Sequence, residues 1–168
     1  MISMQPRLLH NVSIFAVIVS SLFVLIWIGM RAASAVPFGI GEPDAMTAKG
    51  SPSVDIKVPK GVIHAIVVST TEALARGLSG RPSLPKDSGM LFVFPNVGIY
   101  GFWMKDMDFP IDIVWINADK KVSGIARDVE PTTYPKVFYP PSEIRYVLEL
   151  NSGGALDYGI ATGTKLVF

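Results

Sequence analysis

The sequence predicts an α+β domain that is mainly β, a small single domain of about seven short, mostly antiparallel strands. We expect these strands to curl into a barrel-like sheet with one or two short helices. Short runs rich in β-branched and aromatic residues follow one another between residues 54 and 168, and turn residues separate them. This part holds about 115 residues, enough for one hydrophobic core, and contains no internal repeat.

The first strands are predicted from hydrophobic patterning. Apolar and polar residues alternate over residues 54–58, as in a strand with one buried face. After a turn at Gly61, residues 62–69 are rich in β-branched side chains and predict a second strand. Residues 90–94 form a continuous apolar run, which predicts a buried strand.

Short helices are expected at two places. The side chain of Thr70 or Thr71 can cap a helix over residues 72–76, and Gly77 can end that helix. Residues 152–158 are the candidate for the second helix.

The strand pattern continues through the second half of the chain. Residues 101–104 and 111–116 predict two strands, and residues 121–126 follow a hairpin turn. Residues 145–150 and 164–168 predict the last two strands. This succession of short strands favours antiparallel pairing.

The N-terminal region predicts export. Residues 12–30 are nineteen residues without a charge, basic residues flank them, and Ala33-Ser34-Ala35 matches a cleavage pattern. We interpret residues 1–35 as a signal peptide or, alternatively, as an uncleaved membrane anchor, because nineteen residues can just span a bilayer. Residues 36–53, rich in proline, glycine and small residues, predict a flexible linker. The domain is therefore expected in the periplasm or outside the cell, anchored by residues 12–30 if the leader is not cut.

Composition excludes several functions. The chain has 15 basic and 14 acidic residues, and residues 1–35 contain two of the basic ones and none of the acidic ones. The remainder is therefore nearly neutral, and no nucleic-acid partner is predicted. The absence of cysteine excludes a disulfide scaffold, a thiolate zinc site and a cysteine nucleophile. No phosphate-binding glycine motif is present, and no cofactor is predicted.

Five motifs in a fixed order resemble a known family. They lie at residues 77–81 (GLSGR), 89–94 (GMLFVF), 102–105 (FWMK), 110–112 (PID) and 145–149 (RYVLE). Over roughly residues 54–168 the chain closely resembles the domain of unknown function 192 family. The chain has Ser79 where that family usually has methionine, and Asp106-Met107 where it usually has Asn-Thr. The resemblance implies a small, mostly β, often exported domain whose biochemical activity is not established.

A shallow ligand site is predicted from aromatic and charged residues in these motifs. Aromatic residues cluster over residues 100–115, and an aromatic groove with charged edges suits a sugar or another small ligand with polar and apolar parts. Aromatic stacking and a charged pair would orient the ligand. The candidate ligand-binding residues are Arg81, Trp103, Lys105, Asp112 and Glu149.

Asp112 lies in an otherwise apolar strand, where a carboxylate needs a partner. The candidate partners are Arg81, Lys105 and Arg145. Asp106, Asp108 and Asp112 could together hold a hard cation such as Ca²⁺, but their spacing is not that of a calcium loop. No metal site is therefore predicted.

Three classes of function stay open. We favour a ligand-binding module of the cell envelope that takes a small polar or carbohydrate-like ligand. The first alternative is a hydrolase-like enzyme that uses Asp112 and Glu149 as acid and base, which requires both in one concave site. The second is a structural or partner-binding component, with Phe138 and Tyr139 of the proline-rich segment 131–141 as an exposed contact.

Overall fold

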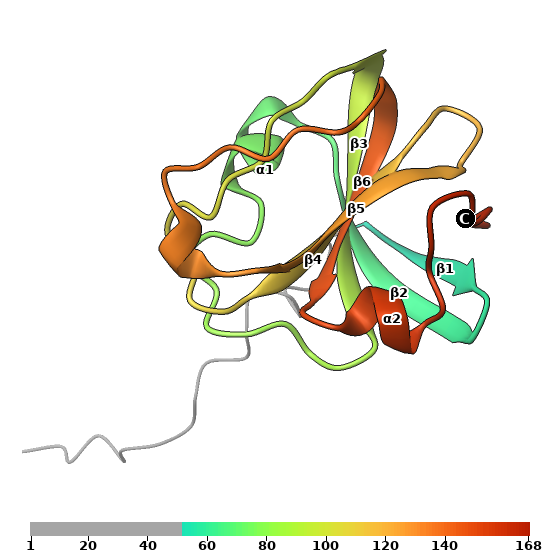
Figure 1. Cartoon of the computed structure of the whole chain (residues 1–168), viewed down its shortest axis with the longest axis horizontal. Helices are drawn as coiled ribbons and strands as arrows, with labels where there is room; N and C mark the ends of the chain where they lie inside the picture. Colours follow the sequence, from blue (N-terminus) through green and yellow to red (C-terminus); the bar gives the residue numbers. More distant parts are fainter. Residues whose placement is uncertain (1–51) are drawn as a thin grey trace, which may run out of the picture. The chain divides into compact units, whose positions relative to one another are not determined.

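In the computed structural model, which describes residues 52–168, six strands form one mixed sheet (Figure 1). The spatial order of the strands is β1-β2-β3-β6-β4-β5. The strands are β1 (Ser53–Val58), β2 (Gly61–Val68), β3 (Ser88–Gly98), β4 (Ile111–Ile116), β5 (Val122–Val129) and β6 (Ile144–Asn151). The two short helices are α1 (Thr71–Arg76) and α2 (Gly154–Asp157), and η2 (Pro131–Thr133) is a 3₁₀ turn.

The β2–β3 pair is the one parallel pair in this sheet, and the other neighbours are antiparallel. Parallel neighbours need a crossover connection, and α1 lies in that connection. The hydroxyl of Thr70 accepts a hydrogen bond from the backbone N–H of Ala73 at 3.2 Å, as the sequence predicted for the start of this helix. Gly77, with φ at 53°, ends the helix.

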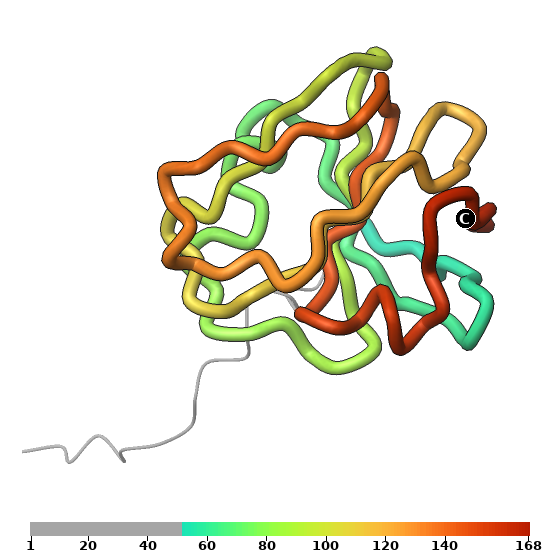
Figure 2. The backbone as a smooth tube through the Cα atoms, viewed as in Figure 1, coloured from blue at the N-terminus to red at the C-terminus, as the bar shows by residue number. Residues whose placement is uncertain are grey.

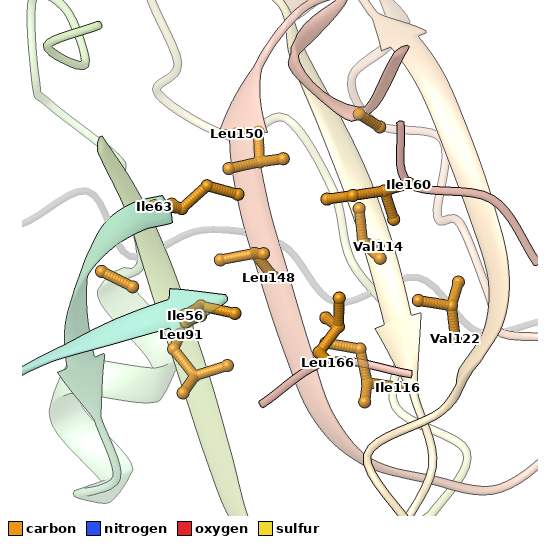
Figure 3. Close-up of a cluster of buried hydrophobic side chains, with 12 residues drawn as sticks. Ile56, Ile63, Leu91, Val114, Ile116, Val122, Leu148, Leu150, Ile160 and Leu166 are labelled. Atoms are coloured by element: carbon orange, nitrogen blue, oxygen red, sulfur yellow. The ribbon is translucent and has the colours of Figure 1, made fainter. Parts of the chain in front are cut away.

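The sheet carries a hydrophobic core on each face. All six residues of β4 are buried, which shows that both faces of this central strand are covered. Figure 3 shows the first core, in which side chains from the sheet pack with Ile160 and Leu166. Ala155 of α2 belongs to the same core. The second core, on the other face, includes Leu78 and Met104 from outside the strands. Full burial of a side chain the size of leucine or methionine stabilises the fold by about 1.5–3 kcal/mol.

The predicted barrel is not supported. The six strands end in two edges, β1 and β5, and do not close on each other. Residues 164–168, predicted as a strand, form isolated bridges instead: Val167 pairs with Lys57 of β1, and Lys165 pairs with Lys121 beside β5. Because each bridge is a single residue pair, this segment touches both edges without forming a ladder with either.

Residues 101–104 are also not a strand, although the sequence predicted one. Phe102 forms an isolated bridge with Phe138, through N–H to carbonyl hydrogen bonds of 2.9 and 2.7 Å. The pairing does not extend beyond Phe102, and the chain turns at Asp106, where φ is 54°. Figure 2 shows residues 99–107 running beside the proline-rich segment 131–141, on the side of the sheet that carries α1.

The predicted leader at residues 1–35 and the linker up to residue 51 lie outside the described residues. Among residues 52–168, no helix is long and apolar enough to cross a bilayer.

Candidate functional site

A cavity of about 310 Å³ opens between the end of α1, strands β3 and β6, and the segment after β3. Its lining is mostly apolar and aromatic. It comprises residues 74–79, Phe92, Phe94, residues 100–103, Met107 and Glu149.

Glu149 reaches this cavity because of the register of β6. It lies opposite Met90 on β3 and Ile113 on β4, and cross-strand partners point to the same face of a sheet. That face carries the second core. The residue is 6% exposed, and its Oε2 is buried with no hydrogen-bond partner among residues 52–168. A buried carboxyl group therefore lines the cavity with unused hydrogen-bonding capacity.

Burial raises the pKa of Glu149 from 4.5 to about 8. Loss of hydration is the cause, because the apolar surroundings penalise the charged form. With this pKa, the Glu149 carboxyl group is protonated in roughly nine-tenths of the molecules at pH 7. The group can then donate one hydrogen bond and accept others. Ionising it requires a compensating charge or dipole.

Aromatic rings form the wall of the cavity. The Phe92 and Phe102 rings meet edge to face at 5.3 Å, and Phe94 stacks on Tyr100 with centroids 3.8 Å apart. Trp103 is 51% exposed, and its ring lies 5.8 Å from that of Tyr134. The structure shows a partly buried Phe102 and an exposed Trp103.

The segment that carries Trp103 is held at several points. The Ser79 hydroxyl donates a hydrogen bond to the Lys105 carbonyl at 2.8 Å, and the Gly80 N–H donates one to the Asp106 carbonyl at 2.8 Å. On its other side the segment forms the Phe102–Phe138 bridge. The cavity wall is therefore built before any ligand arrives, which lowers the entropic cost of binding.

Gly77 shapes the base of the cavity. Its backbone has φ at 53° and ψ at −131°, a combination that residues with a Cβ rarely adopt. A Cβ at this position would lie 3.1 Å from Phe92 Cζ and 3.9 Å from Glu149 Oε2. Glycine thus lets the end of α1 approach the ring and the carboxyl group closely.

Asp112 has a structural role that differs from the prediction. It is fully buried, and its carboxylate accepts hydrogen bonds of 2.9 Å from the backbone N–H groups of Asp128 and Ala155. The predicted ion pair with Arg81, Lys105 or Arg145 is therefore wrong. Two backbone amides satisfy this carboxylate within the first core, beside α2.

Asp112 and Glu149 do not share a site. Asp112 lies opposite Leu150, whereas Glu149 lies opposite Ile113, so the two carboxyl groups point to opposite faces of the sheet. An enzyme in which these two carboxyl groups act together as acid and base in one site is therefore ruled out.

The predicted basic residues lie outside the cavity lining. The Lys105 side chain is exposed, Arg81 is partly buried, and Arg145 donates a hydrogen bond of 2.5 Å to the Pro95 carbonyl. Of the five predicted ligand-binding residues, the structure brings Trp103 and Glu149 together. Residues 52–168 contain no cluster of three or more acidic or histidine side chains that could hold a metal.

Sequence reasoning missed the contribution of α1 to the site. Residues 74–79 line the cavity, and Gly77, Leu78 and Ser79 belong to the first of the five motifs. Three of the other motifs also reach the cavity, through Phe92, Trp103 and Glu149. The joint occurrence of these motifs was the signal that could have pointed to a shared site.

The fold and site define a mainly β domain with one aromatic cavity and a buried carboxyl group. Residues 54–168 match the DUF192 family, described as an uncharacterized ACR. The chain belongs to this family, as its motifs indicated. No curated protein matches the chain.

The solved structures that resemble the chain include two proteins with a TM-score of 0.66. A protein of unknown function from Novosphingobium aromaticivorans DSM 12444 is 26% identical, with a TM-score of 0.66, and the match covers 83% of this chain and 99% of that one. A protein from Sinorhizobium meliloti 1021, proposed to be a transcription regulator, is 24% identical with a TM-score of 0.66. This match covers 70% of this chain and 94% of that one, and it shows the fold alone.

Proposed function

We propose that this domain binds a small molecule in the aromatic cavity, with Glu149 as the buried polar contact and Trp103 at the exposed end. The observation that carries the proposal is the Glu149 carboxyl group, which is buried, lines the cavity and has an oxygen without a partner. Native proteins rarely leave such an atom unsatisfied unless a ligand, an ion or water can reach it.

The dimensions and the chemistry of the cavity support this proposal. A volume of about 310 Å³ falls at the lower end of the range for ligand sites. A ligand with an apolar part would pack against the rings of Phe102 and Trp103, and its polar group would pair with Glu149. A carbohydrate-like ligand is one class with both parts.

A thermal-shift screen with sugars, amines and small carboxylic acids tests the proposal. Ligand at about one hundred times Kd should stabilise the domain by roughly 2.7 kcal/mol. We expect Glu149→Gln and Trp103→Ala to remove the shift. The matched controls Arg81→Ala and Lys105→Ala change residues outside the lining and should retain it. A folded protein that gives no shift with any class would contradict the proposal.

We also propose that the domain acts outside the cytoplasm. Support comes from the uncharged run at residues 12–30 and the cleavage pattern that follows it. The test is to determine the N-terminus of the protein from whole cells and the accessibility of the domain to added protease. An N-terminus at residue 36, or an accessible anchored domain, is expected. An intact, protected chain would refute export.

Contact with a protein partner is the second candidate function. Tyr134, Val137 and Tyr139 of the proline-rich segment are 46%, 36% and 59% exposed, and Tyr134 adjoins Trp103. Phe138, expected in the same exposed contact, is partly buried. A photo-crosslinking residue at position 139 should then form one discrete adduct in cells, whereas the same residue at the exposed position Lys165 should not.

A further inference from the structure

We propose that the ligand of the aromatic cavity is an organic cation, such as a quaternary ammonium compound, held between the Glu149 carboxylate and the surrounding rings. This inference rests on the proposed function and assigns a ligand class to the same site.

The first argument is the missing positive charge. Glu149 Oε2 is buried without a partner, and no ion pair with Glu149 is found among residues 52–168. Within the part of the chain that the structure describes, Arg76 is the one basic residue of the lining, and its side chain is exposed. A neutral ligand could hydrogen-bond to the protonated carboxyl group of Glu149. Only a cation would supply the counter-charge that the ionised carboxylate needs in this buried position.

The second argument is the aromatic wall. Phe92, Phe94, Tyr100, Phe102 and Trp103 all line the cavity. The face of an aromatic ring attracts a cation within about 6 Å, and desolvation strengthens this attraction. Aromatic side chains around a site recognise quaternary ammonium groups in proteins.

The third argument is the scarcity of free polar groups. A sugar needs several hydrogen-bonding partners, but the Ser79 hydroxyl already donates to the Lys105 carbonyl and the Tyr100 hydroxyl to the Asn96 carbonyl. Among residues 52–168, the other polar side chains of the lining are Arg76, Glu149 and the indole N–H of Trp103. A quaternary ammonium ion carries no N–H group, so it needs no hydrogen-bond acceptor and pairs with the carboxylate through charge alone. The lining therefore suits an alkylated cation better than a sugar.

Binding of a cation would be coupled to release of a proton. Because burial raises the pKa of Glu149 to about 8, the free site is mostly neutral at pH 7. On binding, the carboxyl O–H bond breaks, the proton passes to solvent and the carboxylate pairs with the cation. The other charged or titratable groups of the lining are Arg76 from α1 and Tyr100 from the segment after β3. Strands β3 and β4 place the apolar Met90 and Ile113 beside Glu149.

The test is calorimetric titration of the full chain with choline and with 3,3-dimethylbutan-1-ol, its uncharged carbon analogue of the same shape. Buffers without amines are required, because amine buffers are themselves organic cations. We expect choline to bind at least tenfold more tightly than the alcohol at pH 8. Its affinity should rise about tenfold per pH unit from pH 6 toward 8 and level off above that, since one proton is released per ligand.

Matched variants separate charge from shape. Glu149→Gln should weaken choline binding at least tenfold and remove its pH dependence, so that choline no longer binds more tightly than the alcohol. Trp103→Ala should weaken both ligands, and Lys105→Ala should weaken neither. Circular dichroism confirms that each variant is folded.

Two outcomes would overturn the inference in distinguishable ways. If the alcohol or a sugar binds the cavity as tightly as choline, or if choline affinity does not change with pH, the ligand class is wrong and the binding function stands. If the folded chain binds no cation, alcohol or sugar, the inference fails together with the proposed function.

Discussion

The stability of the domain should depend on pH through Glu149, and Glu149→Gln should remove that dependence. Burial raises the pKa of this carboxyl group from 4.5 to about 8, so the folded state holds the proton more tightly than the unfolded chain. The favourable contribution is therefore fully present below pH 4.5, is lost as pH rises, and is exhausted above about pH 8.

The size of the effect follows from the same two pKa values. A shift of one pKa unit corresponds to about 1.4 kcal/mol, so the full shift is worth on the order of 5 kcal/mol. About half of this, on the order of 2 to 3 kcal/mol, falls between pH 5 and pH 7. For a domain of this size that is a decrease in Tm of roughly 10 °C.

Thermal unfolding of the chain and of Glu149→Gln at pH 5, 6, 7 and 8 measures this effect. All other titrating groups are common to both proteins, so the difference between their Tm values isolates residue 149. The two proteins should have similar stability at pH 5, and the variant should become the more stable one as pH rises. Parallel curves for the two proteins would refute the account of a desolvated, unpartnered carboxyl group.

Other substitutions test the structural roles of single residues. Asp112→Asn should lower the free energy of unfolding by about 3 kcal/mol in urea titrations, because its amide would place N–H groups against a backbone N–H of Asp128 or Ala155. An unchanged midpoint would show that these hydrogen bonds do not stabilise the fold. Gly77→Ala should cost about 2 kcal/mol or more, since its φ of 53° and the 3.1 Å approach to Phe92 disfavour a Cβ. A variant as stable as the parent chain would show that α1 can end differently.

Local sequence patterns were sufficient for several elements. The apolar run at residues 111–116 predicted β4 with the bounds that the structure shows. Thr70 and Gly77 predicted both ends of α1 to within one residue. In these cases the information lies within a few neighbouring residues, as hydrophobic patterning or as the capping of backbone groups.

Local patterns failed where the outcome depended on a distant partner. Residues 101–104 and 164–168 have strand-like composition, but a strand also needs a neighbour along its length, and these segments find only isolated bridges. The partners of Asp112 were missed for a similar reason. Its carboxylate binds N–H groups that lie 16 and 43 residues away in the sequence, and any backbone N–H could have served.

The sequence by itself determined the family, most of the strands, the crossover helix and two residues of the cavity, Trp103 and Glu149. Only the tertiary structure decided that the side chains of Glu149 and Asp112 point to opposite faces of the sheet. That choice follows from the pairing of β6 with β4, because a shift of one residue in register would exchange the faces. The cavity likewise exists only once the end of α1, three strand positions and the segment after β3 are brought together by pairings far apart in the chain.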